Sequence, residues 1–225
     1  MSRTARMMLV SLLSLAVMPA WAQGPYLGVG VGRARAADAA SNSRNLANQL
    51  CAAAYGAGAS SCSTSLKYDE NANGFSAFAG MQLNPYLAGE VGYVDLGTYN
   101  LRGSFVITSG GTTSTASGTE EDKASAAYLA AVFSYPVIRR VSLFGKLGLA
   151  YTRLHESCAV SLTTCASGTD TGWGPTFAVG VSAGLVRNVD LRLAYSQFNS
   201  VGDANNEYAA GDFRYLGIAA VVHFR

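Results

Sequence analysis

Residues 126–151 read AAYLAAVFSYPVIRRVSLFGKLGLAY, and this stretch decides the fold. Large apolar residues alternate with mostly small ones on both sides of a short interruption at 136–140. Successive side chains of a β-strand point to opposite faces, so the pattern predicts two antiparallel strands joined by a tight turn. One face of each strand is large and apolar, whereas the other carries Ala, Gly, Ser and the charged residue Lys146.

The same alternation recurs along the chain and predicts eight strands: 27–32, 75–83, 87–93, 126–135, 143–151, 176–185, 189–196 and 216–224. Tight turns at 84–85, 136–140 and 187–188 alternate with long breaks, rich in Ser, Thr, Gly, Asn and Asp, near 34–72, 97–123, 154–172 and 197–212. Within the first long break, 46–55 is expected to form a short helix. Short turns at one end and long loops at the other are typical of a membrane barrel.

The two faces of the strands predict how the barrel is turned. The lumen of an eight-stranded barrel is just wide enough for side chains to fill, which suits the small and polar set. The large apolar set then faces outward, an arrangement that is stable in lipid; a soluble barrel would reverse it. We therefore predict an all-β, eight-stranded antiparallel up-and-down transmembrane β-barrel with short periplasmic turns and long extracellular loops.

The N-terminal segment has the layout of a secretory signal peptide. Arg3 and Arg6 precede an apolar run at 7–17, and Ala20-Trp21-Ala22 provides a cleavage site. We expect residues 1–22 to be removed and 23–225 to form the barrel domain; a retained anchor is the alternative. The two arginines belong to the 16 basic residues, so 23–225 carries 14 basic and 14 acidic groups. A nucleic-acid partner is therefore not expected.

Three charged side chains fall on the lumen face of predicted strands: Glu90, Lys146 and Arg192. Each lies four to six residues beyond a tight turn, so we expect the three to lie in nearly one layer across the lumen. A carboxylate between two cations avoids the cost of an unpaired buried charge. This layer is predicted as a structural ion network, with the gate of a narrow pore as the alternative.

Four cysteines are present, two in each of two long breaks. Cys51 and Cys62 share the first break, and Cys158 and Cys165 share the third. Disulfides persist in exported proteins, and four cysteines allow three pairings. We expect closure within each loop; the spacings do not resemble redox or zinc motifs.

Two further groups of residues are candidates for sites. His155 and Ser157 form an H-x-S pair that resembles an outer-membrane lipid A deacylase, with Glu156 as the candidate orienting acid. The second long break contains an acidic group, which comprises Glu120, Glu121 and Asp122. This group could bind a cation or a receptor, or it could face bulk solvent. Neither is taken as a site: we predict no catalytic centre, no metal and no cofactor.

Several short motifs together resemble the OmpA transmembrane domain. Gln82-Leu83-Asn84-Pro85-Tyr86, followed by Glu90-Val91-Gly92-Tyr93, is similar to the second and third strands of that family. Matching segments follow in order at 135–136, 144–151, 174–181, 191–195 and 201–203. The closing Val222-His223-Phe224 is similar to the terminal signal that the outer-membrane insertion machinery reads.

This resemblance implies an outer-membrane barrel of Gram-negative bacteria with structural, adhesive or weak channel roles. Glu90 and Arg192 match the family's central lumen pair, and Lys146 matches a nearby basic position. Two family positions differ, a lumen lysine that is Val132 here and a lumen acid that is Ser182. The chain ends at Arg225, so tethering through the peptidoglycan-binding domain of larger members is not expected.

Together these observations predict a non-enzymatic integral outer-membrane protein with a structural and surface-presentation role. The expected partners are outer-membrane lipids and lipopolysaccharide, the insertion machinery, and a host or phage surface ligand. Two alternatives stay open, a narrow ion or water pore gated by the lumen charges and a lipid A-modifying hydrolase.

Overall fold

The computed structural model describes residues 24–37, 39–160, 167–201 and 211–224. The expected signal peptide lies outside these residues. The described chain forms one helix and nine strands, which are β1 (Gly24–Ala36), α2 (Ala39–Gly56), β2 (Ser61–Tyr68), β3 (Asn71–Asn84), β4 (Leu87–Ser109), β5 (Thr112–Ile138), β6 (Val141–Val160), β7 (Gly168–Val186), β8 (Val189–Val201) and β9 (Gly211–His223).

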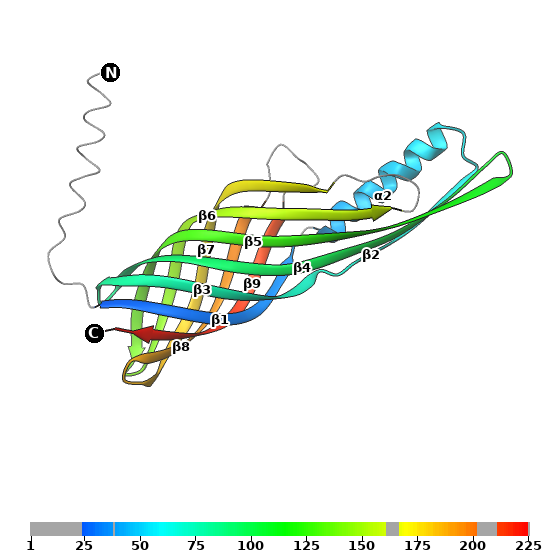
Figure 1. Ribbon diagram of the computed structural model, residues 1–225. Helices are drawn as coiled ribbons and strands as arrows, with labels where there is room; N and C mark the ends of the chain where they lie inside the picture. The colour runs from blue at the N-terminus through cyan, green and yellow to red at the C-terminus, as the bar shows by residue number, and fades with distance from the viewer. Residues whose placement is uncertain (1–23, 38, 161–166, 202–210, 225) are drawn as a thin grey trace, which may run out of the picture.

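Eight of the nine strands close into a ring of antiparallel neighbours. The order is β1, β3, β4, β5, β6, β7, β8 and β9, and β1 pairs with both β3 and β9. The predicted tight turns are present at 85–86, 139–140 and 187–188. In the first of these, Asn84 Oδ1 accepts the Tyr86 N–H at 2.8 Å, a local bond that favours a turn. The up-and-down barrel is thus confirmed (Figure 1).

The predicted orientation of the two faces is also confirmed. Leu147 and Leu193 are 63% and 50% exposed on the outside, whereas Glu90 and Arg192 are buried in the lumen. The apolar band is the set of exposed outward-facing apolar residues around the ring; on β5 it runs from 127 to 135 and on β6 from 143 to 151. Nine residues of tilted strand match the length that crosses a bilayer. No helix in the described residues is long and apolar enough to span a membrane.

The second long break, 97–123, was wrongly predicted as a loop. β4 continues to Ser109 and β5 begins at Thr112, so the two strands run on together past the barrel. Gly110 and Gly111 have φ angles of 56° and 83°, which suit a two-residue hairpin turn. A Gly-Gly pair between alternating residues such as Phe105 and Ile107 is the hairpin signal that was overlooked.

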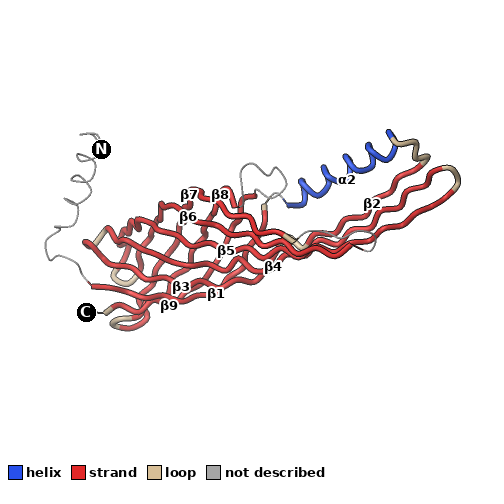
Figure 2. Tube along the Cα trace, turned by 45° about the horizontal axis from the view of Figure 1, so that its top comes forward, coloured by secondary structure: helices blue, strands red, loops and turns tan. Residues whose placement is uncertain are grey.

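The first long break also contains regular structure. β2 pairs with β4 from Leu101 to Thr108 and widens the protruding hairpin to three strands. α2 lies beside these strands and covers more residues than the predicted 46–55 (Figure 2). We call the assembly of α2, β2, 101–109 of β4 and 112–120 of β5 the loop-end extension.

The lumen is filled by aromatic rings as well as by small residues. The Phe78 ring lies over Gly28 on the neighbouring strand, and a Cβ placed on Gly28 would lie 2.2 Å from it. Tyr128 covers Gly92 on β4 in the same way. These two glycines of the lumen face therefore make room for rings from the adjacent strand.

Candidate functional site

The three predicted lumen charges meet at one level of the barrel. Glu90 comes from β4, Lys146 from β6 and Arg192 from β8. Lys146 Nζ donates to Glu90 Oε1, and Arg192 Nη1 donates to Glu90 Oε2 at 3.0 Å. Because each residue lies a similar distance from its tight turn, the antiparallel register brings them into one layer.

Two tyrosines that the sequence analysis missed complete this layer. Tyr128 Oη donates to Glu90 Oε1 at 2.7 Å, and Tyr26 Oη donates to Glu90 Oε2 at 3.0 Å. Both residues have the lumen-facing parity of their strands, Tyr26 two positions before Gly28, and that parity is the signal that could have found them. Each Glu90 oxygen thus accepts two hydrogen bonds, which offsets the cost of burying the carboxylate.

Aromatic rings surround the two cations. Lys146 Nζ lies 4.8 Å from the centroid of the Phe78 ring, and Arg192 Cζ lies 4.8 Å from that of Tyr26. Ring faces attract cations at this range, more strongly where water is excluded. The Glu90 side chain is fully buried, and the side chains of Lys146 and Arg192 are only 11% and 8% exposed. The layer therefore pairs the buried Glu90 carboxylate with both cations across the lumen.

A small cavity lies against the cationic side of this layer. It has a volume of about 40 Å³ and is lined by Lys146, Arg192, Ser76 and Ser196, among others. Arg192 Nε is buried and has no hydrogen-bond partner among the described residues. The rest of its lining is mostly apolar, and its volume is enough for a water beside these polar groups.

At the turn end of the lumen, His223 Nε2 lies 3.0 Å from Asp190 Oδ2. Ser182, which stands where the resemblance implied a lumen acid, donates to the same carboxylate oxygen at 3.3 Å. Asp190 therefore places a second carboxylate in the lumen, two residues before Arg192 on β8.

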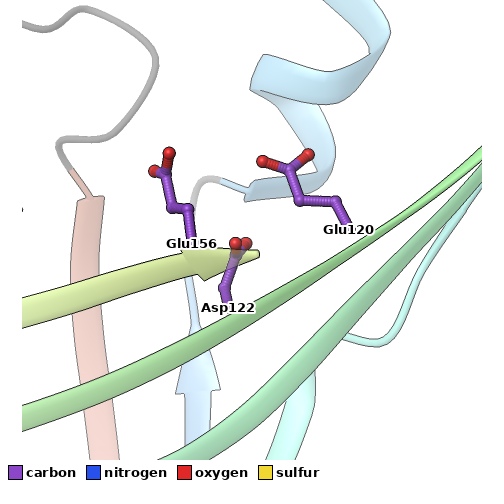
Figure 3. Close-up of side chains that lie close together, drawn as sticks. All are labelled: Glu120, Asp122 and Glu156. Carbon is purple, nitrogen blue, oxygen red and sulfur yellow. The ribbon is translucent and has the colours of Figure 1, made fainter. Parts of the chain in front are cut away.

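A second group of carboxylates lies beyond the apolar band, at the loop end. Glu120 and Asp122 on β5 and Glu156 on β6 point toward one another, with oxygen atoms within 4.8 Å (Figure 3). Burial, and then the charges of Glu120 and Glu156, raise the pKa of Asp122 to about 7. Such an all-oxygen donor set is of the type that hard divalent cations bind.

This cluster differs from the acidic group seen in the sequence. Strand alternation turns Glu121 outward, where it pairs with Lys123 at 3.0 Å, and Glu156 takes its place from the neighbouring strand. Burial, followed by Glu120 and Asp170, raises the pKa of Glu156 as well.

The H-x-S pair is separated from its candidate acid. His155 and Ser157 lie on the outward face of β6, and His155 Nδ1 is 2.8 Å from Thr169 Oγ1. Glu156 points to the opposite face, toward Asp122. It therefore does not orient His155 as a catalytic base.

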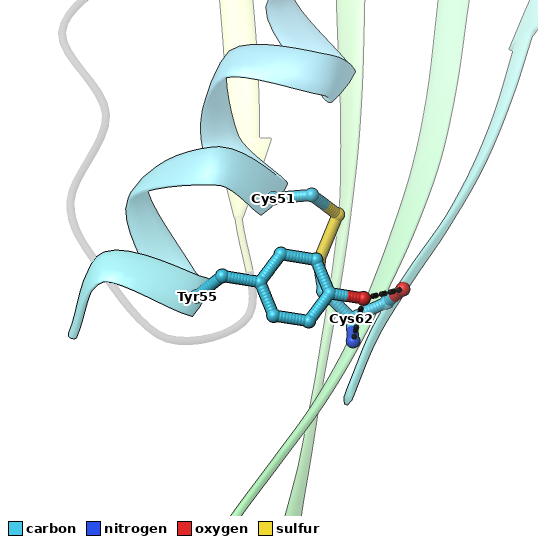
Figure 4. The surroundings of a disulfide bond; sticks show 3 residues. All are labelled: Cys51, Tyr55 and Cys62. Atoms are coloured by element: carbon cyan, nitrogen blue, oxygen red, sulfur yellow. Dashed lines mark hydrogen bonds between the residues drawn. A yellow bond between two sulfur atoms is a disulfide. The ribbon is translucent and has the colours of Figure 1, made fainter. Parts of the chain in front are cut away.

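One of the two expected disulfides is present, between Cys51 of α2 and Cys62 of β2. Figure 4 shows Tyr55 beside it: the Cys62 N–H donates to Tyr55 Oη at 3.1 Å, and this hydroxyl donates to the Cys62 carbonyl at 3.4 Å. The bond fastens the helix to the edge of the extension. The predicted partnership of Cys158 with Cys165 lies outside the residues that the structure describes.

A sequence model described as "OmpA-like transmembrane domain" matches residues 21–225. "Outer membrane protein A" of Shigella flexneri is 32% identical over 155 residues, which is 69% of this chain and 41% of that protein. The same-named protein of Klebsiella aerogenes is 30% identical over 155 residues, 69% of this chain and 40% of that protein. The chain thus spans about two fifths of the length of these relatives.

Among solved structures, Neisserial surface protein A (NspA) matches with a TM-score of 0.52. The match covers 90% of this chain and 99% of the other at 17% sequence identity, so it shows a shared fold.

Proposed function

Because the chain belongs to the OmpA-like transmembrane domain family, we propose that it stabilises the envelope and presents its loop-end extension at the cell surface. The chain is an integral β-barrel of the Gram-negative outer membrane. The observation that carries the proposal is a contrast between two parts of the molecule. The exterior of the barrel is apolar, whereas the loop-end extension is polar and is held by a disulfide.

The build of the extension supports presentation. Its outward-facing positions are hydroxyl-rich and charged, for example Ser63, Ser65, Lys67, Arg102 and Thr115. Three paired strands and a disulfide hold these side chains in place, and a rigid scaffold lowers the entropy cost of binding. A host or phage surface ligand and neighbouring lipopolysaccharide are the partners that fit this position.

Export and insertion complete the proposal. Residues 1–22 act as a signal peptide and leave 23–225 as the barrel domain. The closing Val222-His223-Phe224 serves as the segment that the insertion machinery reads.

The two roles can be separated with a shortened variant. Replacing 101–120 by Gly-Gly joins Asn100 to Glu121, which are register partners, and removes the strands on which β2 and α2 rest. We expect the variant to keep the heat-modifiable gel shift of a folded barrel and to restore envelope integrity to cells that lack the protein. Adherence of these cells to epithelial monolayers should fall to the level of cells without the protein.

Unchanged adherence of the shortened variant would overturn surface presentation. Failure of the full-length protein to restore resistance to detergents would overturn the structural role. An epitope inserted between Gly110 and Gly111, compared with one inserted between Arg139 and Arg140, controls for display: antibody should label intact cells in the first case only.

A second candidate function is a narrow pore, favoured by the cavity beside Lys146 and Arg192. Glu90 links both cations and would act as the gate. Planar-bilayer recording tests it: openings of the wild type that change size in Arg192→Ala support a pore, and a silent wild type overturns it. We propose no hydrolase activity, since Glu156 lies on the face opposite His155.

A further inference from the structure

The outer surface of the barrel has an open groove at the upper edge of the apolar band. It runs across β8, β9, β1, β3 and β4 and has a volume of about 1030 Å³. Its apolar part consists of the exposed side chains Val31, Phe75, Leu193, Leu216 and Ile218. Asn73, Asp95 and Thr98 line it on the side of β3 and β4. A lipid must lie against this face, because it belongs to the part of the barrel that faces the bilayer.

A row of glycines lies behind the groove. Gly32 of β1 pairs with Gly74 of β3 on one side and with Gly217 of β9 on the other. The Tyr215 ring occupies the lumen side of this row, and a Cβ placed on Gly32 or Gly217 would lie within 2.6 Å of it. The wall of the groove is therefore thin, close-packed backbone that an inserted side chain would disturb.

Arginines stand at the upper rim of the groove. Arg33 lines it directly, and Arg35 and Arg214 are register partners one step above. All three point outward and are exposed. Val31 lies two residues below Arg33 and Leu216 two residues below Arg214, so the guanidinium groups lie where the apolar band ends.

Three carboxylates lie near this rim, and one of them, Asp95, lines the groove itself. Glu70 binds Arg35 at 2.7 Å, Asp212 accepts the Gln197 side chain at 3.4 Å, and Asp95 accepts the Gly97 N–H at 2.7 Å. Arg33 and Arg214 form no ion pair with the residues that the structure describes. Arg35 has Glu70 as its counter-anion, so Arg33 and Arg214 are the rim arginines that are left for a further anion among the described residues.

We propose that this groove and its arginine rim bind a phosphorylated, acylated saccharide of the outer leaflet, a lipid A-type glycolipid. One acyl chain occupies the apolar groove, and a sugar phosphate accepts hydrogen bonds from Arg33 and Arg214. Guanidinium groups suit phosphate because they offer paired donors in a fixed plane. The rim lies at the end of the long connections, which is the outer-leaflet side, so the occupant is the lipid of that leaflet.

The test uses the full barrel domain refolded in detergent, with the gel shift as proof of folding. Native mass spectrometry measures the retention of three probes: bis-phosphorylated hexa-acyl lipid A, its dephosphorylated form, and phosphatidylglycerol. We expect the wild type to bind bis-phosphorylated lipid A at least tenfold more tightly than either of the others. Phosphatidylglycerol binding of equal strength would overturn the assignment to lipid A.

Variants locate the site. Arg33→Gln combined with Arg214→Gln should weaken lipid A binding at least tenfold, whereas Arg139→Gln with Arg187→Gln, at the opposite rim, should leave it unchanged. Ile218→Trp fills the groove while keeping both arginines and should weaken binding several-fold. Equal binding by the wild type and the Arg33/Arg214 variant, both still showing the gel shift, overturns the proposal and leaves the proposed function of the barrel standing.

Discussion

Buried carboxylates have opposite surroundings in the barrel lumen and at the base of the loop-end extension. Glu90 in the lumen accepts hydrogen bonds from two cations and two tyrosines. Asp122, near the base of the extension, faces Glu120 and Glu156, and its Oδ1 is buried without a hydrogen-bond partner among the described residues. The lumen charges therefore stabilise the fold, whereas the carboxylates at the loop end repel one another and respond to pH.

The largest expected effect comes from removing the carboxylate that pairs with the two lumen cations. Glu90→Ala should lower the free energy of unfolding by about 3–5 kcal/mol, because it leaves buried charges without a partner. Urea unfolding of the protein in lipid vesicles measures it. The double variant Glu90→Ala/Arg192→Ala should lose less than the sum of the two single variants, and additive losses would contradict the contact between the two side chains.

The next effect concerns the extension alone. Replacing Cys51 and Cys62 by serine removes the bond between α2 and β2, which closes a loop with a sequence separation of 11 residues. We expect a local loss of about 2–3 kcal/mol by the chain-entropy argument, seen as faster hydrogen exchange in β2. The heat-modifiable shift of the barrel should stay unchanged; a barrel that no longer folds would show that the two regions are not independent.

A smaller change removes one donor from the lumen layer. Tyr128→Phe takes away the 2.7 Å hydrogen bond to Glu90 and leaves the ring over Gly92 in place. The expected loss is about 1–2 kcal/mol, because three donors still satisfy the carboxylate. Urea unfolding tests it, with Tyr93→Phe on the outer face as the matched control; equal losses in both variants would contradict the role of the Tyr128 hydroxyl.

The smallest expected effect is a stabilisation, which follows from removing the charge of Asp122. Asp122 has a pKa of about 7 in the folded protein against an ordinary value of 3.8, so the folded form holds a proton that the unfolded form releases between these values. The stability of the extension should therefore fall as pH rises from about 4 to 7. Glu120, Glu156 and Tyr68 face this group, and Asp170 faces Glu156.

Asp122→Asn should reduce that pH dependence and stabilise the extension by about 1 kcal/mol at pH 8, a value discounted for partial exposure. Glu156, whose pKa is also raised, keeps the remaining part. Hydrogen exchange of 112–123 at pH 5 and pH 8 measures both effects. Glu121→Gln, on the outward face of the same strand, is the control and should change little. A pH dependence as large as that of the wild type in Asp122→Asn would assign it to another group.

The sequence predicted the strands within the apolar band but not those of the extension, and the surroundings of each region explain the difference. Within the apolar band, alternation of large and small residues predicted every strand and its orientation, because lipid and a narrow lumen impose opposite requirements on the two faces. Above the band both faces meet polar groups, so 101–109 and 112–120 lack that contrast and read as loops. Only the Gly110-Gly111 pair carried the hairpin signal there.

The sites show the same division. Glu90, Lys146 and Arg192 were found because a charge on a lumen face is conspicuous and its height follows from the distance to a tight turn. Tyr26 and Tyr128 were overlooked because tyrosine occurs on strands in several roles, so its position alone does not indicate a hydrogen bond to a buried carboxylate. Glu156 joined the cluster with Asp122 only through the pairing of β5 with β6.

The sequence by itself determined the barrel, its two faces and its lumen charges, because these depend on residue type and a two-residue period that is written along the chain. The tertiary structure alone decided which groups meet: two tyrosines on one carboxylate, three acids at the loop end, and arginines above a lipid-facing groove. Such contacts join residues far apart in the chain, and their geometry comes from strand register and ring closure, which residue pattern does not encode.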